Sequence, residues 1–282
     1  MKYVYYVIVY LIFAVLFAQG FKKVNRQMKN ASALTILLEL FTSLFALILI
    51  PFYSFKMPTN INIYLTILVV TIIYAVTDRL NIEARYGLDP SKFSMLKQLS
   101  TVFLIIFGFV FLKEELVLKK IIGATLIIVA NILLAIDKNG KFEFNKYFIM
   151  AVISNFLFAV AMLINVNISS NFNIAIYTIF TVFIPSIFIK IFGKISFKEL
   201  KEEFNLYDKK LFLLVSASWC IMLISSVKAY EYGDISVVAP LLTLTTILNA
   251  IYEYIIDKDR KDLMYKLFIS ILIIIGVVLI KI

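Results

Sequence analysis

Long apolar runs dominate the chain, and short polar segments separate them. A helix that crosses a bilayer needs about 20 mostly apolar residues. Several runs are rich in Ile, Val and Phe, which favour strands in water, but a segment in lipid must satisfy its own backbone hydrogen bonds. The pattern therefore predicts an all-α polytopic membrane protein with ten transmembrane helices. The ten runs cover residues 3–21, 31–54, 62–80, 92–112, 118–136, 147–168, 173–193, 210–228, 234–256 and 263–281.

Composition supports a membrane protein, because 62% of the 282 residues are hydrophobic and the mean hydropathy is +0.95. Soluble domains are about 45–50% apolar. We assign the net charge of +10 to loops and anionic lipid headgroups, since no basic patch is interleaved with aromatic residues as nucleic-acid binding would require. Cys220 is the single cysteine and histidine is absent, so we expect no disulfide, no metal site and no cofactor.

The two halves of the chain resemble each other weakly. Tyr86-Gly87 recurs as Tyr232-Gly233, and with that offset RYGLDPSKFSMLKQLSTVF lies over EYGDISVVAPLLTLTTILN. Each half then holds five helices, and an odd number requires the second half to be inverted in the membrane. Inverted repeats are typical of secondary transporters. We predict a first five-helix repeat over 1–136, an inter-repeat loop over 137–145 and a second repeat over 146–282.

Polar residues recur at helical spacing inside several apolar runs. Ser94, Lys97, Gln98 and Thr101 share one helix face, and Asn155 and Trp219 lie singly in two other runs. Charged side chains in hydrocarbon cost a few kcal/mol or more, so they normally face a cavity or a partner. The stripes predict a water-filled central cavity in which Glu39 and Lys97 form a charge pair. The other stripes are Ser32, Thr35, Glu39, Thr42 and Ser43; Thr71, Tyr74, Asp78, Asn81 and Arg85; and Thr246, Asn249 and Glu253.

Each of these residues also has a purely structural interpretation. Lys97 lies close enough to the start of its run for its ammonium group to reach the headgroups. Glu39 would then need only a structural partner. The group Asp78, Arg79, Glu83 and Arg85 lies near a helix end, where a solvated terminus explains the charges. The hydroxyl residues are also common in helix packing.

Two segments resemble a known family. Residues 111–116 (FLKEEL) followed by 122–128 (IGATLII) resemble the turn between helices 4 and 5 of the drug/metabolite transporter superfamily, EamA-type. The second half shows the same frame less closely, with 236–242 (SVVAPLL) similar to the start of the ninth helix. The resemblance implies ten helices, a central cavity lined by helices 1–4 and 6–9, and alternating access. Residues 96–99 (LKQL) also resemble the fourth helix of nucleotide-sugar transporters.

Motifs of enzymes are missing from the sequence, including Gly-rich phosphate loops and nucleophile or metal motifs. We therefore expect no enzyme but a secondary active transporter of a small polar metabolite, such as an amino acid or related compound, with export as one direction. A transporter of nucleotide sugars or other organic anions is the alternative, and a non-transporting scaffold or sensor is the alternative of another class. Expected coupling residues are Glu39 and Asp78. Expected substrate contacts are Glu39, Lys97, Gln98, Thr101, Asn155, Trp219 and Asn249.

The expected partners are a small-molecule substrate and the lipid bilayer, and no nucleic acid is expected. Formation of a homodimer is an additional alternative. A Lys, Ile, Asn and Phe bias without targeting extensions predicts the cell membrane of a prokaryote. Basic residues gather in the loops around 22–29, 190–210 and 258–266. The positive-inside rule then places both termini outside, whereas the resemblance implies cytoplasmic termini.

Overall fold

The structure is a computed structural model, and it describes residues 2–112, 117–135, 145–164, 168–233, 238, 241–256 and 263–281. These residues form α-helices and two short 3-10 turns, and no strand occurs among them. The all-α class predicted from the apolar runs is confirmed. Six of the helices have the length and the apolar composition of a membrane span: α1 (Lys2–Asn25), α2 (Ala31–Leu49, with the following 3-10 turn), α3 (Ile61–Gly87), α8 (Ile174–Phe192), α10 (Lys209–Tyr232) and α13 (Leu263–Lys281).

Six further α-helices lie among the described residues. They are α4 (Pro90–Leu96), α5 (Leu99–Leu112), α6 (Leu118–Ala135), α7 (Lys146–Ile164), α9 (Phe197–Asn205) and α12 (Thr245–Ile255). Three of them depart from the predicted pattern, because the run 92–112 is divided into α4 and α5, and the connector 194–209 between two predicted runs contains α9. Pro240 and residues 136–144 lie outside the described residues. The described part therefore holds twelve α-helices, and the ten-helix arrangement in two inverted repeats stays a prediction.

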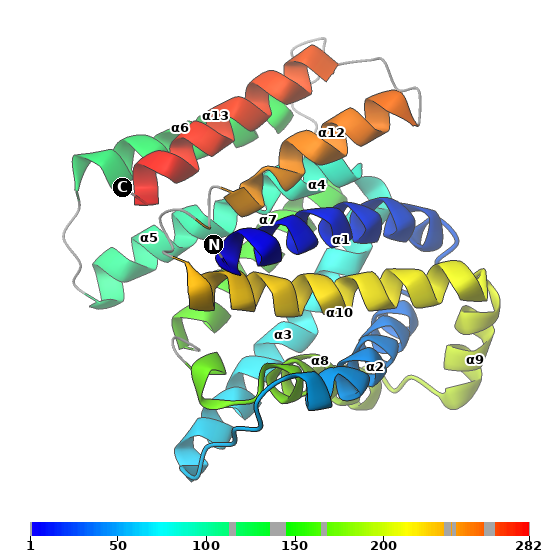
Figure 1. Cartoon of the computed structure of the whole chain (residues 1–282). Coiled ribbons are helices and arrows are strands. Elements are labelled where there is room, and N and C mark those ends of the chain that lie inside the picture. The colour runs from blue at the N-terminus through cyan, green and yellow to red at the C-terminus, as the bar shows by residue number, and fades with distance from the viewer. Residues whose placement is uncertain are drawn as a thin grey trace.

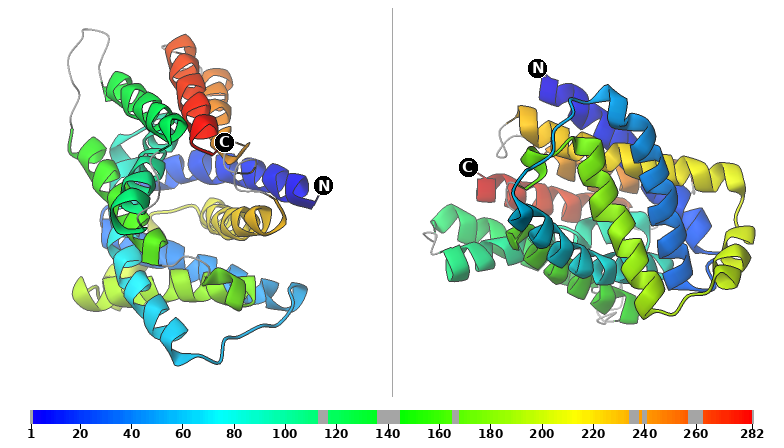
Figure 2. Two further views of the ribbon diagram at one scale, coloured as in Figure 1. Left: turned by 90° about the vertical axis from the view of Figure 1, so that its left-hand side faces the viewer. Right: turned by 90° about the horizontal axis from the view of Figure 1, so that it is seen from below.

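Helices distant in sequence lie side by side. Figure 1 shows α1 along α10 and α6 along α13. The helix α3 packs against α7, α2 against α8, and α4 against α12. Both termini lie at one end of the molecule, while α9 and the turn between α1 and α2 lie at the other end (Figures 1 and 2). Large apolar side chains face outward along α1, α3, α6 and α13, as lipid contact requires.

Close backbone approach joins α6 to α13. A Cβ atom on Gly276 would lie 2.7 Å from the carbonyl oxygen of Gly123, and Gly123 faces Gly276 in return. Small residues permit this approach between helices in lipid. The recurring Tyr-Gly pairs also share a packing role, because Gly87 lies against the ring of Tyr147 and Gly233 against the ring of Tyr3. The two halves thus use the same contact at this one position.

The helix α9 is tied to the start of α2. Ser196 and Glu199 form a reciprocal capping box at its N-terminus, which satisfies backbone donors that a helix start leaves free. Glu203, on the buried face, accepts hydrogen bonds from the backbone N–H groups of Lys29 (3.1 Å) and Asn30 (3.0 Å) and from the Tyr207 hydroxyl. Burial and the hydrogen bond to Glu203 raise the pKa of Tyr207 above its ordinary value. The connector is thus an anchored amphipathic helix.

Candidate functional site

A break separates α4 from α5 at the stretch Lys97-Gln98. The Gln98 N–H bonds to the Met95 carbonyl oxygen (3.0 Å) and the Ser100 N–H bonds to the Lys97 carbonyl oxygen (3.2 Å), each three residues back instead of four. The Ser100 hydroxyl donates to the same Lys97 oxygen (2.7 Å). Serine hydroxyls compete in this way for helix carbonyls. The sequence therefore interrupts its own helix where Lys97 and Gln98 stand.

The break frees a buried carbonyl group. In a continuous helix, Leu96 O would accept from the N–H of Ser100, which here bonds to Lys97 O instead. Leu96 O instead accepts a hydrogen bond from the side chain of Asn155 on α7. The Asn155 Nδ2 atom lies 3.1 Å from Leu96 O and 2.7 Å from Ala151 O. Unpaired polar groups in lipid cost several kcal/mol. Asn155, a predicted substrate contact, is thus occupied in satisfying the broken helix.

Four charged side chains from three parts of the bundle interact near this break. Asp78 interacts with Glu39 of α2 and electrostatically with Lys97 and Arg85. Lys97 interacts in turn with Arg85. Neither carboxylate oxygen of Glu39 has a hydrogen-bond donor among the described residues, and Asp78 is the charged group that it meets. We call Glu39, Asp78, Arg85 and Lys97 the charged cluster.

The residues of the charged cluster differ in their exposure to solvent. Glu39 is completely buried, because its stripe on α2 faces the interior. Asp78, Arg85 and Lys97, in contrast, keep part of their surface accessible. With two carboxyl groups and two cationic groups, the cluster offers both signs of charge within one small region. Such a region among apolar helices is normally functional, because each isolated charge would be expensive there.

Aromatic side chains surround the Arg85 guanidinium group. It lies 3.8 Å from the ring centre of Phe93, 5.1 Å from that of Phe17 and 5.9 Å from that of Phe21. Trp219 of α10 stacks on Phe17 with ring centres 5.7 Å apart. Guanidinium groups favour such stacking over aromatic faces. Trp219, a predicted substrate contact, therefore adjoins the charged cluster through Phe17.

A second residue of α7 reaches the charged cluster. The hydroxyl oxygen of Ser154 lies 2.7 Å from Oδ1 of Asn81 on α3, and Asn81 hydrogen-bonds Asp78. Consecutive residues of α7 therefore bond to two different helices. Ser154 bonds to the Asn81 side chain on α3, next to Asp78, and Asn155 bonds to the Leu96 carbonyl group of α4, next to Lys97.

The remaining predicted contacts lie in other environments. Gln98, at the break, donates a hydrogen bond from its side-chain amide to the carbonyl oxygen of Ser94 in the preceding helix α4 (3.4 Å). Asn249 of α12 accepts a 2.9 Å hydrogen bond from Gln19 of α1, and both residues are buried. The side chain of Thr101 lies outside the described part of the structure. Asn249 thus joins two helices, and its relation to a substrate stays a prediction.

The structure changes two expectations about charge pairs. Glu39 interacts with Asp78, and Asp78 with Lys97, so the expected direct pair of Glu39 and Lys97 becomes a chain through Asp78. The group of charged residues near the end of α3, for which a solvated terminus was one interpretation, separates into two environments. Arg79 bonds to Ser32 (2.9 Å) and pairs with Glu83 (3.4 Å) near the surface, whereas Asp78 and Arg85 enter the charged cluster. The spacing of seven residues between Asp78 and Arg85 had already predicted that they share one helix face.

A separate buried network holds the start of α4. Glu253 of α12 accepts hydrogen bonds from the backbone N–H (2.8 Å) and hydroxyl (2.6 Å) of Ser91, and it pairs with Lys266 of α13 at 2.8 Å. Both charged side chains are buried. The short helix α4 is therefore fixed at its first turn by Glu253 and at its last carbonyl group by Asn155.

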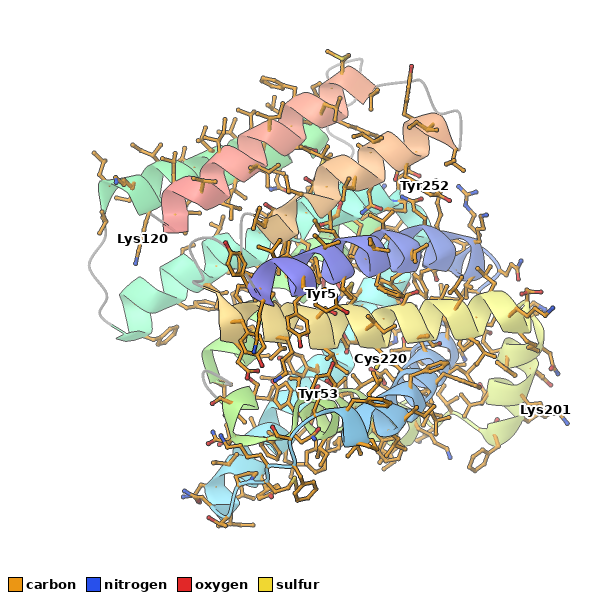
Figure 3. The ribbon with its side chains drawn as sticks, in the orientation of Figure 1. Tyr5, Tyr53, Lys120, Lys201, Cys220 and Tyr252 are labelled. Atoms are coloured by element: carbon orange, nitrogen blue, oxygen red, sulfur yellow. The ribbon has the colours of Figure 1, made fainter. Side chains whose placement is uncertain are left out.

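Figure 3 places basic residues at opposite ends of the molecule, with Lys201 on α9 and Lys120 at the start of α6, while Cys220 lies on α10 within the bundle. Cys220 is a free, buried thiol. Among the described residues, no group of three or more His, Cys, Asp or Glu side chains could hold a metal ion. The charged cluster itself offers carboxyl and cationic groups for hydrogen bonding and ion pairing.

A bundle of apolar helices around a charged cluster defines a multi-pass membrane protein. Residues 1–136 match the model of the EamA-like transporter family, which is part of the drug/metabolite transporter superfamily. This half of the chain belongs to that family, as residues 111–116 and 122–128 indicated. The family is one of transporters rather than enzymes.

The comparison with solved structures concerns the fold alone. A crystal structure of another protein superposes with a TM-score of 0.60, covering 99% of this chain and 96% of the other at 12% sequence identity. No curated protein matches the sequence. The fold is thus shared along the full chain.

Proposed function

We propose that the protein is a secondary active transporter that moves a small polar metabolite by alternating access around the charged cluster. The membership of residues 1–136 in a transporter family supports transport. The observation that carries the proposal is the placement of Glu39, Asp78, Arg85 and Lys97 together inside an apolar helix bundle. Partial exposure of three of them gives a substrate access to their charges.

The charge balance favours a substrate that carries both signs. Lys97 and Arg85 suit a carboxylate, while Asp78 and Glu39 suit an ammonium group. An amino acid or a related zwitterion uses both pairs. A nucleotide sugar or another organic anion would use only the cationic pair and would face two carboxyl groups. The balanced cluster therefore favours the zwitterion over the organic anion.

The Glu39–Asp78 contact supports a coupling role for these two residues. Two carboxyl groups in contact repel each other strongly when both are ionised, and one proton shared between them would relieve that repulsion. A proton held there is available for exchange when the cluster opens to one side of the membrane. Coupling to a proton gradient therefore accompanies the proposed transport.

The experiment is uptake by purified protein in proteoliposomes. Labelled amino acids and labelled nucleotide sugars are supplied separately, and each is tested for counterflow against the same unlabelled compound inside. The proposal predicts counterflow of at least one zwitterion, lost in Asp78→Asn and kept in Glu202→Gln on the exposed face of α9. Counterflow of nucleotide sugars alone would contradict the zwitterion, and counterflow that survives Asp78→Asn would remove the cluster from the transport path.

A further inference from the structure

Two consecutive residues of α7 make hydrogen bonds next to the charged cluster without belonging to it. Asn155 Nδ2 donates to the carbonyl oxygen of Leu96 (3.1 Å), the residue directly before Lys97. Ser154 lies 2.7 Å from Asn81, the partner of Asp78 on the same helix face. The helix α7 therefore contacts the supports of both Lys97 and Asp78 at a single point along its length.

The break between α4 and α5 depends on the first of these contacts. Leu96 O is left without its helical donor, because the Ser100 N–H bonds to Lys97 O. If Asn155 withdraws, this buried oxygen regains a partner most easily by closing the helix, so that the Ser100 N–H returns to Leu96 O. Closing the helix turns Lys97 relative to Asp78. The Asn155 hydrogen bond and the orientation of Lys97 are thus linked through one carbonyl group.

We propose that Asn155 and Ser154 are positioning residues that hold Lys97 beside Asp78, and that they transmit the position of α7 to this charge interaction. The inference rests on the proposed function, since it describes how the transport site is held. The helix α7 lies in the predicted second repeat, while α3 and α4 lie in the first. A movement of one half against the other therefore changes Asp78 and Lys97 together, through two adjacent side chains.

The chain contains a matched control for Asn155. Asn131 is a buried asparagine of α6 whose Nδ2 bonds to the carbonyl oxygen four residues back, Ile127 O, at 2.8 Å. Asn155 makes the same local bond to Ala151 O and adds the bond to Leu96 O. Replacing each asparagine by leucine keeps the branched shape and the number of side-chain heavy atoms, and it removes the same local bond. The two variants then differ in the bond across helices.

The test measures the coupling between Asp78 and Lys97 in purified protein without any substrate. The rate at which acetic anhydride acylates Lys97 is followed by mass spectrometry, since only the neutral amine reacts. We expect Asp78→Asn to raise this rate about fivefold in the wild-type background, a size typical of directly interacting residues. The same substitution should change the rate by less than about twofold in Asn155→Leu, while Asn131→Leu keeps the full effect.

Ser154→Ala supplies a milder second variant, because it removes only one hydroxyl group, and we expect it to reduce the coupling as well. An unchanged effect of Asp78→Asn in both Asn155→Leu and Ser154→Ala would overturn the inference. An equal loss of coupling in Asn131→Leu would also overturn it, because the effect would then be general loosening. This measurement uses no transport, so a failure here is separate from a failure of counterflow in proteoliposomes.

Discussion

The carboxyl group of Glu39 meets that of Asp78 inside the helix bundle, and neither oxygen of Glu39 has a hydrogen-bond donor among the described residues. Two acids placed together in an apolar setting favour one shared proton over two negative charges. Lys97 and Arg85 balance the remaining charge on Asp78. The proposed function assigns to this arrangement both a proton site and an ion-binding site in one charged cluster.

Replacing Glu39 by glutamine tests the proton site. Glutamine keeps the size of the side chain and can donate a hydrogen bond to Asp78, but it carries no exchangeable acid proton. We expect Glu39→Gln to abolish accumulation driven by a pH gradient while exchange of pre-loaded substrate continues. Uptake into proteoliposomes with and without the gradient measures both activities. Gradient-driven accumulation at the wild-type rate would remove Glu39 from coupling.

Arg85 should not tolerate lysine. The guanidinium plane stacks on Phe93 at 3.8 Å, and an ammonium group cannot reproduce a planar stack. We expect Arg85→Lys to lower the free energy of unfolding by about 1–2 kcal/mol, measured by thermal unfolding in detergent. The control is Arg79→Lys, because Arg79 lies near the surface and pairs with Glu83; there the change should stay below about 0.5 kcal/mol. Equal effects at both positions would contradict a stabilising role for the aromatic rings around Arg85.

Glu203 should be the residue that anchors α9. Its carboxylate accepts two backbone N–H groups at the start of α2 and the hydroxyl of Tyr207. Glu203→Ala leaves these donors without their partner, and we expect a loss of about 2–3 kcal/mol. The neighbouring Glu202 is a matched control, since its side chain is 66% exposed and Glu202→Ala should cost less than about 0.5 kcal/mol. Proteolysis within residues 194–209 should rise in the first variant alone.

The capping box of α9 gives a prediction for acid conditions. Hydrogen bonds from the backbone and the hydroxyl of Ser196 hold the pKa of Glu199 below its ordinary value of 4.5. A depressed carboxyl pKa stabilises the fold above the ordinary value, and this contribution is lost as the pH falls through the folded pKa. We expect the protection of the Ser196 amide, which is its exchange rate compared with that of an unprotected amide at the same pH, to fall on acidification below about pH 4.5. In Glu199→Gln this acid-dependent step should be absent, and a persistent step would assign it to another group.

The apolar runs predicted the fold class and most helix positions, because burial in lipid forces long apolar segments to become helices. They could not predict the break at Lys97-Gln98, which arises from a balance of single hydrogen bonds from Ser100 and Asn155. They also missed α9, whose short amphipathic pattern is set by contact with α2. The capping box at Ser196 and Glu199 was the signal that could have found its start.

The polar stripes located the charged cluster but not its pairing. Glu39, Asp78 and Lys97 were each predicted to face the interior, and the structure brings them together. Arg85 lay on the same predicted stripe as Asp78, and a solvated helix end remained the alternative for both, because a sequence shows only the distance from that end and not the rings of Phe17 and Phe93 from other helices. Asn155 was predicted to contact substrate, since its polar side chain gave no sign that a distant carbonyl group needed it.

The most direct test of the central claim is a thermal-shift screen of the purified protein against a metabolite library, run beside Lys97→Met. A ligand that binds only the folded state raises its stability by mass action. Methionine keeps the unbranched stem of the side chain and removes the charge. The account predicts that a zwitterionic compound stabilises the wild-type protein and fails to stabilise Lys97→Met. A zwitterion that stabilises both proteins equally would contradict the charged cluster as the transport site.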